Sequence, residues 1–141
     1  MITSNESLGR NYALLTGIRG IGRQTAIMAI VYTGNFTKFD CWRKFASYCG
    51  VAPFEFSSGT SVKARTRVSH LANRQLKAML HLCALSSIRF NTEMRLYYEK
   101  RTLEGRNKMS TLNIIRNKLI ARMFAVVKRG SPYVDNLKYA A

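Results

Sequence analysis

Residues 14–36 read LLTGIRGIGRQTAIMAIVYTGNF, and this stretch decides the fold. Its glycine-rich centre, GIRGIG at residues 17–22, interrupts two runs with helical character. Residues 6–15 are polar with apolar punctuation, which predicts a short helix. Residues 25–32 are apolar almost all round, which predicts a buried helix. The Gly-Asn pair at residues 34–35 tolerates the left-handed backbone that ends helices, so the stretch predicts two helices joined by a tight turn.

The turn also has the form of a helix-hairpin-helix motif, in which an apolar residue precedes a Gly-x-Gly and a helix follows. Gly20 and Gly22 permit tight backbone geometry there, and N–H groups at the start of the second helix are then free to hold a DNA phosphate. Arg19 and Arg23 flank the turn and strengthen this interpretation. The alternative is that the glycines only permit close packing of a helical hairpin.

Helical patterns return on both sides of one irregular segment. We expect Asp40 to open a helix that ends at Gly50. We expect Ser69 to cap the next helix, because serine is a preferred N-cap residue. Further apolar stripes predict a helix over residues 91–103, which Gly105 breaks, and a last helix that begins near Ser110.

The irregular segment at residues 51–68 begins with proline, glycine and small residues. It then alternates apolar or small residues with Lys63, Arg65 and Arg67, a period of two that suggests an extended basic arm. We therefore predict one mainly α, multi-helix domain over residues 1–141. It has a helix-hairpin-helix region at 14–50, the loop and arm at 51–68, and a helical region at 69–130.

The net charge of the chain indicates which kind of partner it binds. The chain has 23 Lys and Arg against 7 Asp and Glu, a net charge of +16, while its 47% apolar content is that of a folded protein. No acidic residue lies between Glu55 and Glu93 or from Gly105 to Val134, whereas ordinary solvated faces mix both signs. These windows favour a nucleic-acid partner. A membrane surface is the competing polyanion, but no apolar run is long enough to span a bilayer.

Cysteines, histidines and tyrosines favour structural roles. Cys41, Cys49 and Cys83 form no pattern typical of a zinc site with His70 or His81, so we predict no bound metal. Buried or half-buried thiols in a reducing cytoplasm are the preferred interpretation. Three tyrosines are candidates for stacking on bases but are expected more often in the core: Tyr97, Tyr98 and Tyr133.

Ser58 lies in the stretch SSGTS at residues 57–61, directly before the basic arm. A serine hydroxyl is a poor nucleophile without a base, a metal or positive charge beside it. No GxSxG motif is present and no His/Asp pair lies nearby in sequence, so chemistry alone favours a loop or phosphate-binding serine.

A resemblance to a known family favours a catalytic role for Ser58 instead. The order LLTGIRGIGRQTA, then FDCWRKFASYCGVAP, then SSG, a basic arm and ANRQLK resembles the C-terminal transposase domain of the IS116/IS110/IS902 family of bridge-RNA-guided recombinases. The resemblance runs from about Leu14 to Tyr133. Gly-Val-Ala-Pro followed by Ser-Gly is its most specific part.

The resemblance implies that Ser58 attacks DNA and forms a covalent link to a DNA end, with Ser57 and Ser61 as weaker candidates. It also implies nucleic-acid contacts for Asn73 and Lys77. We expect a set of nearby cations to neutralise the phosphates around Ser58: Lys63, Arg65, Arg67 and Arg74. Lys77 stands where the family has arginine, and lysine does not offer the same bidentate fork to a phosphate.

In the same family, an N-terminal RuvC-like domain binds Mg²⁺ and completes the site. The seven acidic residues here are scattered, so we expect an isolated domain that lacks the RuvC-like part, has no cofactor of its own, and binds DNA or RNA without cutting alone. Expected partners are DNA, a guide RNA, the RuvC-like domain and further copies in a dimer or tetramer. The expected location is the prokaryotic cytoplasm, with the nucleoid. The alternatives are a non-catalytic helix-hairpin-helix module and a membrane-surface or scaffolding protein.

Overall fold

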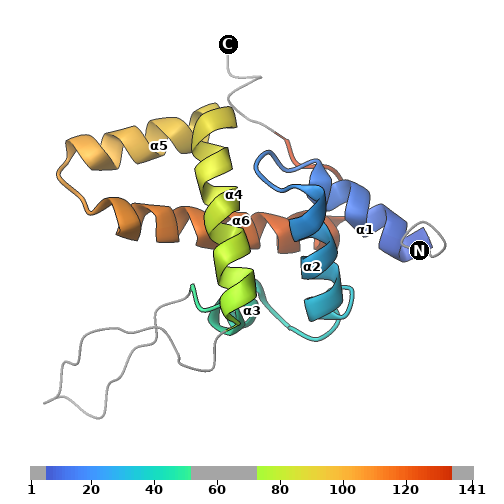
Figure 1. Cartoon of the computed structure of the whole chain (residues 1–141). Coiled ribbons are helices and arrows are strands. Elements are labelled where there is room, and N and C mark those ends of the chain that lie inside the picture. The colour runs from blue at the N-terminus through green and yellow to red at the C-terminus, as the bar shows by residue number, and fades with distance from the viewer. Residues whose placement is uncertain (1–5, 52–72, 135–141) are drawn as a thin grey trace, which may run out of the picture.

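The computed structural model describes residues 6–51 and 73–134, which form six helices and no strand (Figure 1). The mainly α prediction is confirmed. The predicted Ser-Gly loop and basic arm lie outside the described residues, apart from Val51. The helices are α1 Glu6–Thr16, α2 Arg23–Thr33, α3 Trp42–Tyr48, α4 Arg74–Phe90, α5 Thr92–Leu103 and α6 Lys108–Arg129.

α1 and α2 form the predicted helical hairpin, and α2 ends as expected at Gly34, whose backbone is left-handed with φ 57°. Side-chain amides fasten the far end of the hairpin, because Asn11 Nδ2 donates to Asn35 Oδ1 at 2.8 Å. The prediction that α2 is buried all round is wrong. Val31 is 64% exposed because α2 packs against α1 and α4 on one side only.

α3 begins two residues later than predicted, at Trp42 with Cys41 as N-cap. Asp40 does not open the helix. Its carboxylate instead accepts a hydrogen bond from Lys44 Nζ at 2.7 Å on the exposed surface. Gly50 ends this region with φ 77°, a backbone conformation that favours glycine.

The three C-terminal helices share one capping device. Asn73, Asn91 and Asn107 each accept a backbone N–H from the first turn of α4, α5 and α6. The N-cap of α4 is therefore Asn73 and not Ser69, and α6 begins two residues before the predicted Ser110. The helix expected over residues 91–103 is confirmed as α5.

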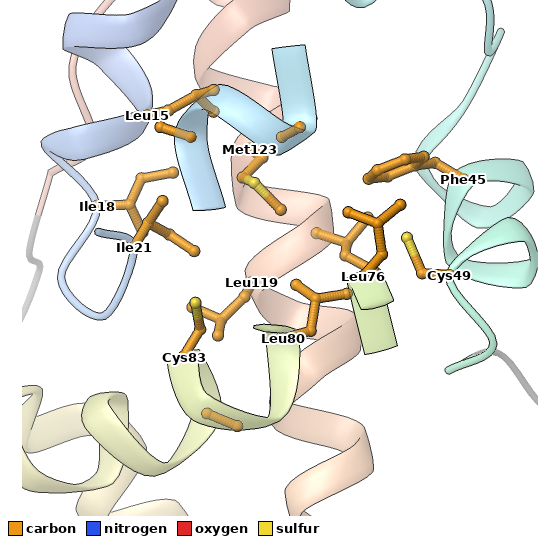
Figure 2. Packing of buried hydrophobic residues seen from close by; sticks show 14 of the residues in the cluster. Leu15, Ile18, Ile21, Phe45, Cys49, Leu76, Leu80, Cys83, Leu119 and Met123 are labelled. Carbon is orange, nitrogen blue, oxygen red and sulfur yellow. The ribbon is translucent and has the colours of Figure 1, made fainter. Parts of the chain in front are cut away.

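α6 runs through the centre of the molecule and contacts α1, α3, α4 and α5 (Figure 1). Figure 2 shows how Leu119 and Met123 of α6 converge with side chains from the other elements, among them Leu80 of α4, Phe45 of α3 and Ile18 of the glycine turn. Leu119 and Met123 are at most 1% exposed. This core holds the glycine turn and the start of α4 at fixed places on one body.

Candidate nucleic-acid interface

Gly20 lies in the turn between α1 and α2 and presses against the second half of α4. Its φ is +100°, and a Cβ built on it would lie 2.0 Å from Ser87 Oγ and 3.1 Å from the Cys83 carbonyl oxygen. Arg19 beside it is exposed, and its Nη1 donates to the Phe90 carbonyl at 3.3 Å, at the carboxyl end of α4. The geometry supports the alternative interpretation for Gly20, which is close packing of helices.

Gly22, two residues later, has no such close contact at its Cα. It is the N-cap of α2 and has no side chain of its own to cap the helix, its backbone hydrogen-bonds the Cys83 thiol, and a Cβ there would meet no heavy atom within 4 Å. Arg23 follows as the exposed first residue of the helix. With Arg23 beside it, this helix start suits a phosphate, because the remaining N–H groups and the helix dipole both favour an anion.

Asn73, Arg74 and Lys77 lie together at the amino end of α4. The Asn73 side chain has a structural role, since its Oδ1 accepts from Leu76 N at 3.1 Å and caps the helix. Its backbone N–H donates to the Tyr48 carbonyl at 2.7 Å, which fastens the start of α4 to the end of α3. Arg74 is exposed and Lys77 half-buried.

The structure does not bring these two groups together. The glycine turn lies against the carboxyl half of α4 and Asn73 lies at its amino end. The 17 residues of the helix span about 25 Å. Contact with both groups requires an extended ligand.

Ser58, Lys63, Arg65 and Arg67 lie outside the described residues, but the two residues that flank residues 52–72 are firmly held. Val51 is fully buried and its N–H donates to the Ala46 carbonyl at 3.1 Å. Its own carbonyl accepts two hydrogen bonds from α6, from Asn113 Nδ2 at 2.7 Å and Asn117 Nδ2 at 3.1 Å.

Asn73 is tied to Tyr48 of α3, three residues before Val51. Both residues that flank the segment with the predicted serine, Val51 and Asn73, are therefore hydrogen-bonded to α3. The sequence analysis did not identify Asn113 and Asn117. Two asparagines four apart on a helix are a visible signal, but nothing in the sequence pairs them with Val51.

Most of the positive charge in the described part has no acidic partner. Residues 6–51 and 73–134 form two ion pairs, Lys44–Asp40 and Arg122–Glu93. The tyrosines predicted for the core are used within the fold: Tyr97 lies under Lys118 at 3.9 Å, and the Tyr133 ring lies under Arg122 at 4.8 Å. The unpaired cations remain available to a polyanion.

The three cysteine thiols differ in their exposure to solvent. Cys49 and Cys83 are buried as predicted, and burial raises the pKa of Cys49 to about 12 and also raises that of Cys83. Cys41 is exposed, which corrects the expectation for that residue, because the helix it caps turns its own start to solvent. Within the described ranges no three His, Cys, Asp or Glu side chains gather as a metal site, so these residues do not fit the Mg²⁺ that the resemblance implies.

None of the helices in the described ranges is long and apolar enough to cross a membrane. A groove of about 500 Å³ lies between α6 and the residues around the start of α3, with Phe39, Trp42 and Phe124 in its lining. No residue of the candidate interface lines it.

Comparison with known proteins identifies the family. Over 124 residues the chain is 32% identical to the insertion element IS110 43.6 kDa protein of Streptomyces coelicolor, which covers 88% of this chain and 30% of that relative. It is 25% identical over 134 residues to the pilin gene-inverting proteins of Moraxella bovis and Moraxella lacunata, covering 94% of this chain and 42% of each.

The chain thus spans less than half the length of these relatives. The model of the transposase IS116/IS110/IS902 family matches residues 12–99, which include the glycine turn, Ser58 and the whole of α4. The chain belongs to the IS116/IS110/IS902 family of transposases.

Proposed function

We propose that this chain is the part of a DNA transposase or recombinase that binds DNA and supplies a serine nucleophile. The family match carries the proposal. The names of the relatives, an insertion-element protein and a pilin gene-inverting protein, both point to DNA rearrangement. The net charge of +16 supports a polyanionic substrate independently of any relative.

Ser58 is the proposed nucleophile. Its Oγ loses a proton and forms a bond to a DNA phosphorus, while the bond from that phosphorus to a sugar oxygen breaks and the released oxygen takes up a proton. The product is a serine–DNA phosphodiester, which a second DNA end reverses during strand exchange. Because phosphoryl transfer depends mainly on positioning and charge stabilisation, the cations of the adjacent arm, Lys63, Arg65 and Arg67, would act directly on this step.

The described residues supply the supporting contacts. Arg74 and Lys77 at the start of α4 neutralise phosphates close to where residues 52–72 re-enter the fold. The Gly22–Arg23 end of α2 holds backbone beside Cys83 of α4, nine residues after Arg74 and therefore about 14 Å further along the helix. A duplex that lies along α4 would satisfy both groups.

A working transposase assembly would need further parts. A RuvC-like domain would hold Mg²⁺, a guide RNA would select the target, and further copies would bring two DNA ends together. Because the described residues contain no metal cluster, we expect the chain alone to bind DNA without cutting it.

Replacement of Ser58 by alanine in the protein joined to its RuvC-like partner tests the nucleophile. We expect strand exchange to be abolished, because no other oxygen occupies the attacking position. Ser57→Ala and Ser61→Ala are matched controls in the same loop and should retain exchange. The assignment is contradicted if Ser58→Ala carries out strand exchange normally, or if Ser61→Ala is the one variant that loses strand exchange.

A non-catalytic nucleic-acid-binding module is the second candidate, because the open helix start at Gly22 and Arg23 needs no serine chemistry. It predicts salt-dependent DNA binding with a slope of about −0.9 per phosphate neutralised, but no covalent product. A membrane-surface or scaffolding protein predicts no steep salt dependence on DNA.

A further inference from the structure

Arg116 is a buried cation without a counter-charge in the described structure. It lies in the middle of α6 and is 5% exposed. Its Nη1 donates to Asn113 Oδ1 at 3.4 Å and its Nη2 donates to His81 Nδ1, and both of these acceptors are neutral. Its Nε is buried and has no hydrogen-bond partner in the described ranges.

The acidic residues of the described ranges do not compensate this charge. Asp40 pairs with Lys44 and Glu93 with Arg122, and no carboxylate there forms an ion pair with Arg116. A buried charge without an opposite charge is costly, and burial accordingly lowers the pKa of the guanidinium. An arrangement of this kind suits an anion that the described residues do not supply.

His81 connects Arg116 to the surface. A guanidinium can only donate, so His81 Nδ1 must accept, and the ring proton then lies on Nε2 as a donor. Burial and the neighbouring Arg116 charge both lower the pKa of His81, which keeps the ring neutral. His81 is half-buried, so its ring is accessible in part.

His81 also continues a line of basic residues along α4, although its own ring is neutral. Arg74, Lys77 and His81 have the spacing i, i+3 and i+7, which places them on one face of the helix. This face lies close to the point where residues 52–72 join the fold. Asn113, which accepts from Arg116, donates to the carbonyl of Val51.

We propose that Lys77 and His81 bind a phosphate of the nucleic-acid backbone, with Arg116 supplying positive charge from beneath and holding His81 in its donating tautomer. Lys77 and the His81 Nε2–H contact the phosphate oxygens, and Arg116 is a positioning residue. The inference rests on the proposed function, because it takes the ligand to be DNA. It extends the interface on α4 by one helical turn beyond Lys77.

A purely structural polar network is the rival explanation, and the two differ in what happens when the charge is removed. If Arg116 serves only the fold, its loss should destabilise the protein. If it serves a ligand, its replacement by an apolar side chain of similar length should leave stability unchanged or raise it, because an uncompensated buried charge is removed.

The decisive variant is Arg116→Met in the 141-residue chain, with Arg122→Met as its matched control. Arg122 lies on the same helix but pairs with Glu93 at 2.8 Å. Binding of a mixed-sequence DNA duplex is measured by fluorescence anisotropy over a series of salt concentrations, and thermal unfolding is measured in parallel.

We expect Arg116→Met to bind DNA about tenfold more weakly at low salt, with a salt slope shallower by about 0.9, and to keep or raise its melting temperature. Arg122→Met should lower the melting temperature, because Glu93 loses its ion pair and keeps only the hydrogen bond from Tyr133, and should retain the wild-type salt slope.

A second variant tests the contact without touching the buried charge. In His81→Asn the amide oxygen can still accept from Arg116 while the Nε2–H donor is lost. We expect about fivefold weaker DNA binding with an unchanged salt slope, because the lost group is neutral. Leu82→Asn, at a neighbouring position that is 62% exposed, should bind like wild type.

The outcomes separate the two proposals. The phosphate site is overturned if Arg116→Met keeps the wild-type affinity and salt slope, or if His81→Asn keeps the wild-type affinity. The proposed function still stands in that case, provided that the wild-type chain binds DNA with a steep salt dependence. A lowered melting temperature in Arg116→Met with an unchanged slope assigns the residue to the fold. A wild-type chain that does not bind DNA overturns both.

Discussion

Gly20 and Gly22 are two positions apart in one turn and face different demands. Gly20 combines a φ of +100° with a contact so close that a Cβ would lie 2.0 Å from Ser87 Oγ. Gly22 has neither restriction. The sequence predicted the turn from its glycines, but identical residue letters gave no sign that one is required for packing and the other leaves a helix start open.

Gly20→Ala should therefore lower the free energy of unfolding by about 2–4 kcal/mol, from backbone strain together with overpacking against α4. Gly22→Ala should cost no more than about 1 kcal/mol, the difference expected between glycine and alanine at an N-cap. Urea denaturation followed by circular dichroism measures both. Equal stabilities of the two variants would show that the turn does not depend on the contact with Ser87.

At the scale of elements, hydrophobic periodicity and the glycines at helix ends predicted the helices well. The N-cap residues were predicted less well. Ser69 and Asn73 are both good N-cap residues, and local sequence does not say which one begins the helix. The backbone bond from Asn73 to Tyr48 depends on α3 lying beside α4. For the same reason the sequence predicted α2 as buried all round, because its composition does not reveal which side of the helix its neighbours leave exposed at Val31.

Asn73→Ala should lower the free energy of unfolding by about 1 kcal/mol, because the N–H of Leu76 loses its acceptor. Asn73→Asp is the control, since a carboxylate also caps and favours the helix dipole. Stability comes from thermal unfolding and DNA affinity from anisotropy. Unchanged stability in the alanine variant contradicts a capping role. Full DNA affinity in the aspartate variant contradicts a phosphate contact at this position.

The sequence predicted which residues belong to the candidate site, but not how they are arranged in space. Arg74, Lys77 and the glycine turn were identifiable from charge, spacing and family motif. Their separation along α4 was not, because it follows from how α2 packs on α4. Arg116 belonged to an acid-free window in the sequence, but its burial and its contact with His81, 35 positions away, appear only in the folded chain.

At the scale of the whole molecule, one helix joins core and interface. α6 buries Leu119 and Met123 among the other helices, while Asn113 and Asn117 of the same helix hold Val51 and so one flank of residues 52–72. Val51, the residue directly before the segment that carries the proposed serine, is therefore held by the central helix of the fold. Such an anchor suits a nucleophile that must meet a phosphate with fixed geometry.

The central claim is that Ser58 becomes covalently joined to DNA. The most direct test uses the protein joined to its RuvC-like partner, a suicide DNA substrate that cannot be religated, and mass spectrometry of the digested adduct. We predict a DNA-linked peptide that carries the modification on Ser58, present in the wild type and absent in Ser58→Ala. Efficient cleavage of the substrate with no adduct, or an adduct that persists in Ser58→Ala, would contradict the account.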